Sequence, residues 1–410
     1  MSKRRVAVVI SSLVGAVLAA LPATADPGVF VLDGVGGANG RTAHGIGQDT
    51  ANAVFEGDLF VFSYDATSGN LRVGRRTARW EFETLDGAGG TNGRIAANVG
   101  SDLAAITHGG ALHAFYRDDT HGDLRHARFD GSSWSFETLD GAGGAGGRKD
   151  ANVGTSISTI TFRRSLFVFY VDRSNTNIRR ARLAEAWTFA TIDGAGGIGG
   201  RIAGDVGYQT TAAEYDGSLH VFYFFQDPFC DPDFGCRLFG TIRHAALAPG
   251  TSWTVEDVRE INCCFEDLSL ATAIVSDSSV WLFYQNFGLH SENLRHLHWN
   301  GSAWVQETPD GLVEEVPSDG ESVGYGASAL TFEGRPYVFY HGAFNFIGPP
   351  DGVRQAFWNG SSFVVANIGV FLGRPTSSRV RGGLRLVFVG DATIPVDRFD
   401  GHDLVQARLA

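Results

Sequence analysis

Arginine recurs at one position of a repeated segment, and it is the first residue type in this sequence whose spacing indicates chemistry. Each guanidinium group offers five N–H donors in a fixed fork. Two interpretations stand. One is a ring of ligand-binding sites between neighbouring repeats. The other, which is favoured, is a salt bridge between neighbouring repeats to the aspartate that ends the strand before the arginine. The arginines are Arg72, Arg125, Arg179, Arg243, Arg295 and Arg354, and the aspartates are Asp65, Asp118 and Asp172. From this set, the candidate ligand-binding residues are Arg125, Arg179, Arg243, Arg295 and Arg354.

Carboxylates gather in two loops that break the repeat, at 225–236 and 259–267. Because Ca²⁺ takes six to eight oxygen ligands, Asp231, Asp233, Glu266 and Asp267 are candidate ligands for this ion. Asp227 joins the candidate ligand-binding residues. The spacing is not that of an EF-hand, so solvated acidic loops are the favoured interpretation. No cofactor is expected other than this calcium alternative.

Four cysteines lie in the same two loops: Cys230, Cys236, Cys263 and Cys264. An even number suits an oxidising compartment and predicts disulfides. Bridges between the two loops are one alternative, and a local bridge plus a vicinal bridge is the other. Zinc is disfavoured because the spacing matches no common zinc motif.

Acid–base chemistry has three candidate residues, His290, Glu292 and His341, which follow repeated strands. A hydrolase could draw an acid and a base from such a set. Nothing in the sequence pairs them, so a binding protein is preferred to an enzyme.

These residues need a scaffold, which is indicated by seven copies of an apolar, aromatic strand. The copies begin 53, 54, 53, 61, 56 and 48 residues apart, at Leu59, Leu112, Leu166, Leu219, Val280, Pro336 and Leu384. A period of this size is typical of solenoids, propellers or arrays. Each unit contains four strands, named A to D, which in the second unit are 103–107, 112–118, 123–129 and 134–139. This pattern predicts an all-β fold, a seven-bladed β-propeller of four-stranded antiparallel blades.

The two chain ends are expected to close the ring. The seventh unit ends with residues 403–410, which match strand C, and residues 29–34 match the strand D copy at 82–87. We therefore expect the N-terminal strand to complete the last blade and remove an open sheet edge. Because strands of a meander alternate in direction, B–C and D–A loops share one face, where we expect the functional site.

Two further repeated features have a structural and a functional interpretation. Gly-rich D–A loops at 33–41, 86–94, 140–148 and 193–201 could bind anions or sugars, but a scaffold role is favoured. An aromatic residue opens strand D, and blade packing is favoured over sugar stacking for it. These aromatic residues are Trp80, Trp134, Trp187, Trp253, Trp304 and Phe363.

The first 25 residues indicate a secretory signal peptide: a basic start, an apolar stretch and an Ala23-Thr24-Ala25 cleavage site. Residues 26–410 then form one propeller domain with 30 basic and 45 acidic residues, a formal net charge of −15. This charge disfavours nucleic acid and anionic membranes. We expect a secreted monomer, since no other segment could span a bilayer.

The second unit resembles a known family of blades. Phe115-Tyr-Arg-Asp118, Gly122-Asp-Leu-Arg-His126 and Asp130-Gly-Ser-Ser-Trp134 together resemble the repeat of bacterial and fungal β-propeller lectins, including the fucose-binding group. The resemblance implies sugar sites between adjacent blades, built from an arginine, a carboxylate and an aromatic residue. The fucose-site residues themselves are not matched.

Three functions follow in order of preference. The first is a carbohydrate-binding, lectin-like module whose partner is a glycan or another extracellular ligand. The second is an extracellular glycosidase or lyase with its site over blades four to six. The third is a protein-binding scaffold.

Overall fold

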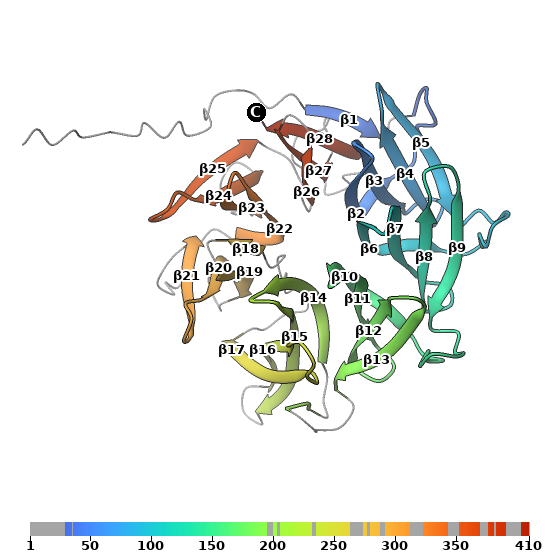
Figure 1. Cartoon of the computed structure of the whole chain (residues 1–410). Coiled ribbons are helices and arrows are strands. Elements are labelled where there is room, and N and C mark those ends of the chain that lie inside the picture. Colours follow the sequence, from blue (N-terminus) through green and yellow to red (C-terminus); the bar gives the residue numbers. More distant parts are fainter. Residues whose placement is uncertain are drawn as a thin grey trace, which may run out of the picture.

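The chain forms four-stranded antiparallel sheets arranged around a central axis, as a computed structural model shows (Figure 1). The structure describes residues 29–34, 36–194, 200–202, 206–231, 235–262, 274–276, 279–287, 292–311, 323–342, 352–369, 376–380, 383–390 and 403–409. Within these residues, no helix is long and apolar enough to cross a membrane. The predicted signal peptide lies outside the described residues.

Six blades are each built from four strands that follow one another in the chain. Blade one has β2 (Ile46–Phe55), β3 (Asp58–Asp65), β4 (Asn70–Arg76) and β5 (Trp80–Asp86). Blade two has β6 (Val99–His108), β7 (Ala111–Asp118), β8 (Asp123–Phe129) and β9 (Trp134–Asp140). Blade three has β10 (Val153–Phe162), β11 (Ser165–Asp172), β12 (Asn177–Leu183) and β13 (Trp187–Asp193).

The next three blades follow the same order. Blade four has β14 (Val206–Tyr215), β15 (Ser218–Asp231), β16 (Gly235–Leu247) and β17 (Thr254–Asn262). Blade five has β18 (Ile274–Ser276), β19 (Ser279–Phe287), β20 (Glu292–Trp299) and β21 (Trp304–Asp310). Blade six has β22 (Val323–Phe332), β23 (Arg335–Gly342), β24 (Val353–Trp358) and β25 (Phe363–Gly369).

The remaining sheet is composite, in the order β1-β28-β27-β26. It joins β26 (Thr376–Val380), β27 (Gly383–Gly390) and β28 (Asp403–Leu409) to β1 (Val29–Asp33) from the other end of the described chain. The expected count of seven blades is therefore corrected: the described chain has six continuous blades, and not seven, plus this composite sheet. Within the described residues, the strand beside β28 is β1, so this sheet is not built from four consecutive strands.

The pairing predicted for the two chain ends is confirmed. β1 runs antiparallel to β28, with Val29 opposite Ala407 and Val31 opposite Val405. The outer edge of β28 is therefore covered by β1, and the free N–H and C=O groups of that edge are paired.

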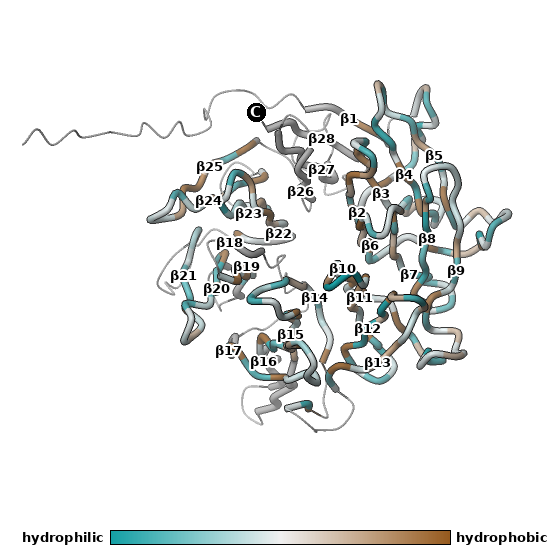
Figure 2. The backbone as a smooth tube through the Cα atoms, in the orientation of Figure 1, coloured by the Kyte–Doolittle hydropathy of each residue, from teal (hydrophilic) through white to brown (hydrophobic). Residues whose placement is uncertain are grey.

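The core lies between neighbouring blades, where the aromatic strands B meet the next blade. All eight residues of β7 and of β11 are buried. One cluster joins Phe60 and Phe62 of blade one to Leu112 and Trp134 of blade two. Figure 2 shows the alternation of apolar strand segments and polar loops that produces this packing. The packing interpretation of Trp134 is confirmed, because its ring meets Phe62 edge-on at 6.0 Å.

Strand A bulges at the same place in neighbouring blades. The register between β6 and β7 shifts after Ser101, and the register between β10 and β11 shifts after Thr155. Asp102 and Ser156 occupy these bulges with positive φ angles of 51° and 55°. A bulge re-aims a side chain, and non-glycine residues with positive φ often mark functional positions.

Candidate functional site

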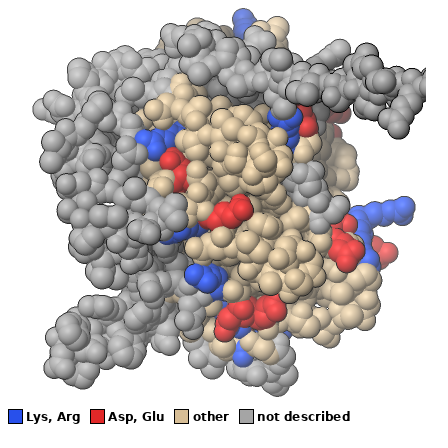
Figure 3. All heavy atoms as spheres, turned by 90° about the vertical axis from the view of Figure 1, so that its left-hand side faces the viewer, with Lys and Arg blue, Asp and Glu red and all other residues tan. Residues whose placement is uncertain are grey.

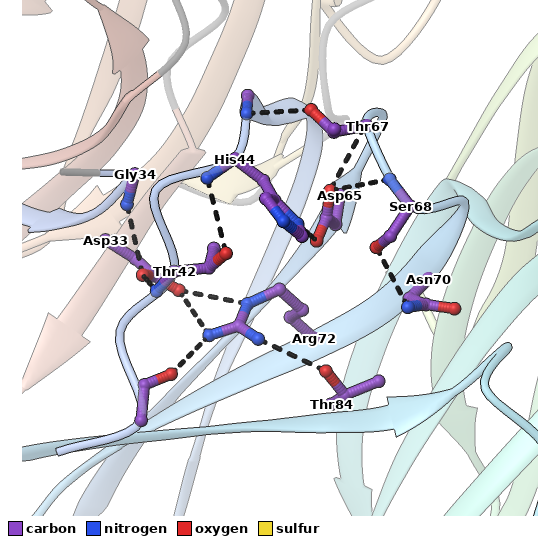
Figure 4. A network of polar contacts seen from close by, with 12 residues as sticks. Asp33, Gly34, Thr42, His44, Asp65, Thr67, Ser68, Asn70, Arg72 and Thr84 are labelled. Atoms are coloured by element: carbon purple, nitrogen blue, oxygen red, sulfur yellow. Dashed lines mark hydrogen bonds and ion pairs between the residues drawn. The ribbon is translucent and has the colours of Figure 1, made fainter. Parts of the chain in front are cut away.

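Buried ion pairs between arginine and aspartate join neighbouring sheets. In Figure 4, Nε and Nη2 of Arg72 on β4 donate to Oδ2 of Asp33 at 3.0 and 2.8 Å. Asp33 ends β1, so this pair ties the composite sheet to blade one. The same relationship recurs between Arg125 and Asp86, Arg179 and Asp140, Arg243 and Asp193, and Arg354 and Asp310.

The prediction of which aspartate pairs with each strand C arginine was wrong. The partner is the residue that ends strand D of the preceding blade, whereas Asp65 at the end of strand B serves its own turn. Its Oδ1 accepts the backbone N–H groups of Thr67 and Ser68 at 3.1 and 3.0 Å. Its Oδ2 lies 2.8 Å from Nδ1 of His44, so both oxygens of Asp65 have partners other than the arginine.

These contacts give the strand C arginines a structural role. Arg125 and Arg179 are each only 1% exposed. Nη2 of Arg125 also donates to the carbonyl of Gly93 at 2.7 Å, and Nη1 donates to Thr138 at 3.0 Å. Arg295 is also buried and bonds to Thr308. Direct ligand binding by Arg125, Arg179, Arg243, Arg295 and Arg354 stays a prediction.

The Gly-rich loops support these arginines, as the scaffold interpretation predicted. The backbone oxygens of Gly40, Gly93, Gly147 and Gly200 each accept a hydrogen bond from a strand C arginine. Gly93 has a φ of +86°, and an added Cβ would lie 2.0 Å from the backbone oxygen of Phe136. Glycine is therefore needed for the loop to approach the next blade.

A pocket of about 600 Å³ lies between blades three and four. This volume falls within the usual range for a small-ligand site. It is lined by Phe167, Arg180, Arg182, Arg201, Leu247, Thr251, Ser252 and Trp253. Three of these residues are arginines, and the lining, all of it in the described chain, contains no aspartate or glutamate. We call this feature the arginine pocket.

Arg180 owes its position to a change in the repeat. The matching residues of blades two and four, His126 and His244, bond through Nδ1 to Glu137 and Glu256 at 3.0 and 2.9 Å. In blade three the residue opposite Arg180 across the β12–β13 pair is alanine at position 190. The carboxylate is therefore replaced by a methyl group, and Nη1 of Arg180 is buried without a hydrogen-bond partner in the described structure.

Arg182 has lost a carboxylate in the same way. The matching residue of blade one, Arg75, lies over the Phe60 ring and forms an ion pair with Asp58 at 2.7 Å. Arg182 lies over the Phe167 ring at 5.5 Å, but its partner is the hydroxyl of Ser165 at 3.1 Å. A serine hydroxyl leaves the positive charge uncompensated.

Arg201 and Trp253 also line the arginine pocket. In the two preceding blades the loop arginine lies over a phenylalanine ring: Arg94 over Phe136 and Arg148 over Phe189. In blade four the matching strand position is Val255, which offers no ring. Arg201 is held by one bond from Nη2 to the carbonyl of Thr191 at 3.0 Å.

The pocket is electrostatically prepared for an anion. Burial, followed by the positive charge of Arg182, lowers the pKa of Arg180 from its ordinary value. Arginine stays protonated under these conditions. On the side of β21 and β25, by contrast, Figure 3 shows basic and acidic side chains interspersed over the described surface.

A second polar cluster surrounds the bulge on β6. Oδ1 of Asp102 accepts the backbone N–H of Ser156 at 2.8 Å, and Oδ2 of Asp49 accepts the backbone N–H of Asp102 at 3.3 Å. Burial raises the pKa of Asp102 to about 6, and the negative charge of Asp49 adds to this effect. Arg117 and Arg173 act in the opposite direction. A carboxyl group with such a pKa can exchange protons near neutral pH.

Several predicted residues remain untested. Asp233, Glu266, Asp267, Cys263, Cys264 and His290 lie outside the described residues, and only the backbone is described at Asp227, Asp231 and Glu292. Cys230 and Cys236 stand directly opposite each other in the β15–β16 pair. His341 stands opposite Tyr325 in the β22–β23 pair. The calcium, disulfide and catalytic assignments stay predictions.

Sequence reasoning missed the arginine pocket. Its signal was the run Arg179-Arg180-Ala181-Arg182, in which the first and last arginines follow the repeat and Arg180 departs from it. The second signal was alanine at position 190, where four other units have Glu83, Glu137, Glu256 and Glu307.

No protein-family profile matches the chain, and no curated protein matches it either. Among solved structures it is similar to a polysaccharide lyase described as an ulvan lyase, with 10% identity, a TM-score of 0.56, and 89% of this chain and 94% of that chain covered. It is also similar to the polysaccharide lyase Uly1, with 13% identity, a TM-score of 0.52, and coverage of 92% and 91%.

A fucose-specific lectin from Aleuria aurantia aligns at 17% identity and a TM-score of 0.43, with 79% of this chain and 94% of that chain covered. The resemblance is supported at the level of the fold alone, by the two lyase structures with TM-scores above 0.5. No specific family is shown.

Proposed function

We propose that this protein binds an anionic polysaccharide, with an acidic group of the sugar chain held in the arginine pocket. The observation that carries the proposal is the set of three arginines around about 600 Å³ of space with no lining carboxylate. The acidic group is a carboxylate or a sulfate ester, since both accept paired hydrogen bonds from a guanidinium group.

The surrounding residues suit a sugar ring. Half-buried Trp253 and buried Phe167 provide apolar walls, and Thr251 and Ser252 provide hydroxyl groups. Ligand sites commonly combine such walls with a few placed polar groups. The polysaccharide lyases among the structural neighbours make a polysaccharide a reasonable ligand class.

The overall charge of the protein opposes a polyanion, because 33 basic residues face 45 acidic residues. Charges more than about 8 Å apart are largely screened at physiological salt. A local group of three arginines therefore dominates the field inside its own pocket. Binding is expected to weaken as salt is added.

Isothermal titration calorimetry on residues 26–410 tests the proposal, with a uronate-bearing and a sulfated polysaccharide compared with a neutral one. We expect saturable binding of an acidic polymer and at least a tenfold loss of affinity in Arg180→Ala and in Arg182→Ala. Arg75→Ala is the matched control, because Arg75 has the same strand position as Arg182 but is paired with Asp58. Equal binding of the neutral polymer, or unchanged affinity in Arg180→Ala, contradicts the proposal.

A second candidate function is cleavage of the bound polysaccharide, and one observation favours it. Asp102 lies in the bulge of β6 with a φ of 51°, and burial raises its pKa to about 6, which suits a group that donates or accepts a proton during catalysis. Release of new chain ends, or of unsaturated ends absorbing in the ultraviolet, distinguishes an enzyme from a lectin-like protein.

A further inference from the structure

Blade five contains a buried histidine whose hydrogen bonding is incomplete. In blade two, Nε2 of His126 meets Nδ1 of His113 at 2.9 Å, and in blade four Nε2 of His244 meets Nδ1 of His220 at 2.8 Å. Both ring nitrogens of each strand C histidine therefore have partners. His296 occupies the same position in blade five, but strand B there carries Trp281 instead of histidine.

The indole nitrogen of Trp281 could only donate such a hydrogen bond, and in the described structure it is itself buried without a hydrogen-bond partner. The His296 side chain is fully buried, and its Nε2 has no hydrogen-bond partner in the described structure. Nδ1 of His296 lies 3.4 Å from Oε2 of Glu307, which is longer than an ordinary hydrogen bond. A buried polar atom left in this state needs an explanation.

A second histidine beside His296 suggests an explanation for the unpartnered nitrogen. His298 follows His296 by two residues on β20, so both side chains lie on the same face of the sheet. Nδ1 of His298 is also buried without a hydrogen-bond partner in the described structure. Glu307 stands directly opposite His296 on β21. One ligand atom from each of these three residues lies within 4.8 Å of the other two.

We propose that His296, His298 and Glu307 bind a divalent transition-metal ion of the zinc type. Two imidazole nitrogens and one carboxylate oxygen are a common zinc donor set and leave one coordination position open for water. A metal–nitrogen bond is about 2.0–2.1 Å long, so the three side chains must contract slightly around the ion.

The surroundings suit such a site. Trp281 packs against the His296 ring at 4.3 Å, and Phe363 of blade six meets the same ring edge-on at 5.3 Å. These rings exclude water from one side of the three side chains. The Glu307 side chain is 39% exposed and leaves a route from solvent on the other. The site lies in blade five and is independent of the arginine pocket.

The test uses residues 26–410 without an affinity tag, dialysed against EDTA and titrated with Zn²⁺ and with Co²⁺. We expect one equivalent of each ion to bind, with a rise in melting temperature that EDTA reverses. His298→Phe, which introduces the residue type that blade six has at this position in Phe357, and Glu307→Gln should each weaken binding at least tenfold. His126→Val, which introduces the residue type of Val73 in blade one, is the matched control and should keep full binding.

Each of the following outcomes overturns the proposal. Failure to bind either ion does so directly. Undiminished binding in correctly folded His298→Phe would place the ion elsewhere in the protein. A thiolate-to-cobalt charge-transfer band would show that cysteines hold it.

Discussion

Arg180 on β12 stands directly opposite Ala190 on β13, at a position where blades two and four place a histidine opposite a glutamate. The exchange removes a carboxylate and adds a stronger cation at the same point of the repeat. An uncompensated, partly buried charge is costly to the fold, and a bound anion would offset this cost.

Restoring the missing carboxylate should place a negative charge beside Arg180, inside the arginine pocket. In Ala190→Glu, the new side chain reaches Arg180 across the strand pair and competes with the anionic ligand. We expect the affinity for an acidic polysaccharide to fall at least tenfold, which corresponds to about 1.4 kcal/mol. The melting temperature should rise, because the buried guanidinium gains a partner. Calorimetry and thermal unfolding measure the two effects on one sample.

The matched control is Ala366→Glu in blade six. Residue 366 occupies the same strand D position, but it faces Gln355 and not an arginine. Polysaccharide affinity should stay unchanged there. Equal loss of affinity in both variants would show that the added negative charge acts at long range rather than inside the pocket.

The ion pairs between blades should dominate stability. In Arg125→Met, the carboxylate of Asp86 stays buried but loses its ion pair with the next blade. The hydroxyl of Tyr116, at 2.6 Å, is then its remaining partner from that blade. Loss of one partner of a buried pair costs about 3–5 kcal/mol. We expect this loss in urea unfolding. The double variant Arg125→Met with Asp86→Asn should be less destabilised than the single one, because the buried charge is gone. Similar destabilisation of both would contradict a charge effect.

The repeat, its four strands and the pairing of the chain ends were predictable because each depends on local pattern. Alternating apolar residues define a strand, and a unit with three strands needs a fourth from elsewhere. The choice between Asp65 and Asp33 as the partner of Arg72 was not predictable. It depends on how one blade is placed against the next, and the spacing within a single unit carries no such information.

The arginine pocket was hidden for a related reason. Arg180 becomes unusual only when β12 and β13 are in register and Ala190 is seen to face it. The bulge at Asp102 is also invisible in the sequence, because an extra residue in strand A leaves the apolar pattern of strand B unchanged.

Asp102 should destabilise the fold at neutral pH. Its pKa in the folded state, about 6, exceeds the ordinary value of 3.8, so ionisation opposes folding above about pH 4. Each unit of pKa shift corresponds to about 1.4 kcal/mol. Asp102→Asn should therefore unfold at a higher temperature than the parent protein at pH 8, and at a similar temperature at pH 4. A lower melting temperature at pH 8 would refute this account. If the protein cleaves polysaccharide, the same variant should lose turnover while keeping its affinity.

The stacked histidines of blade two should make the protein sensitive to acid. Burial, followed by the positive charge of His126, lowers the pKa of His113 to about 3, and burial also lowers the pKa of His126. In the unfolded chain these groups take up protons near pH 6.5. Because the unfolded state then binds more protons, stability falls as pH drops below 6.5, and the loss continues towards the folded pKa.

Glu137 acts in the same direction, since its bond to His126 lowers the pKa of its carboxyl group, and stability is lost as pH falls towards the folded value. Each extra proton on the unfolded state costs about 1.4 kcal/mol per pH unit. The double variant His113→Phe with His126→Val reproduces the residues of blade one, Phe60 and Val73, which do not titrate. Its free energy of unfolding, measured in urea at pH 7 and pH 5, should fall less with acid than that of the parent. An equal fall in both proteins would place the acid sensitivity outside this pair.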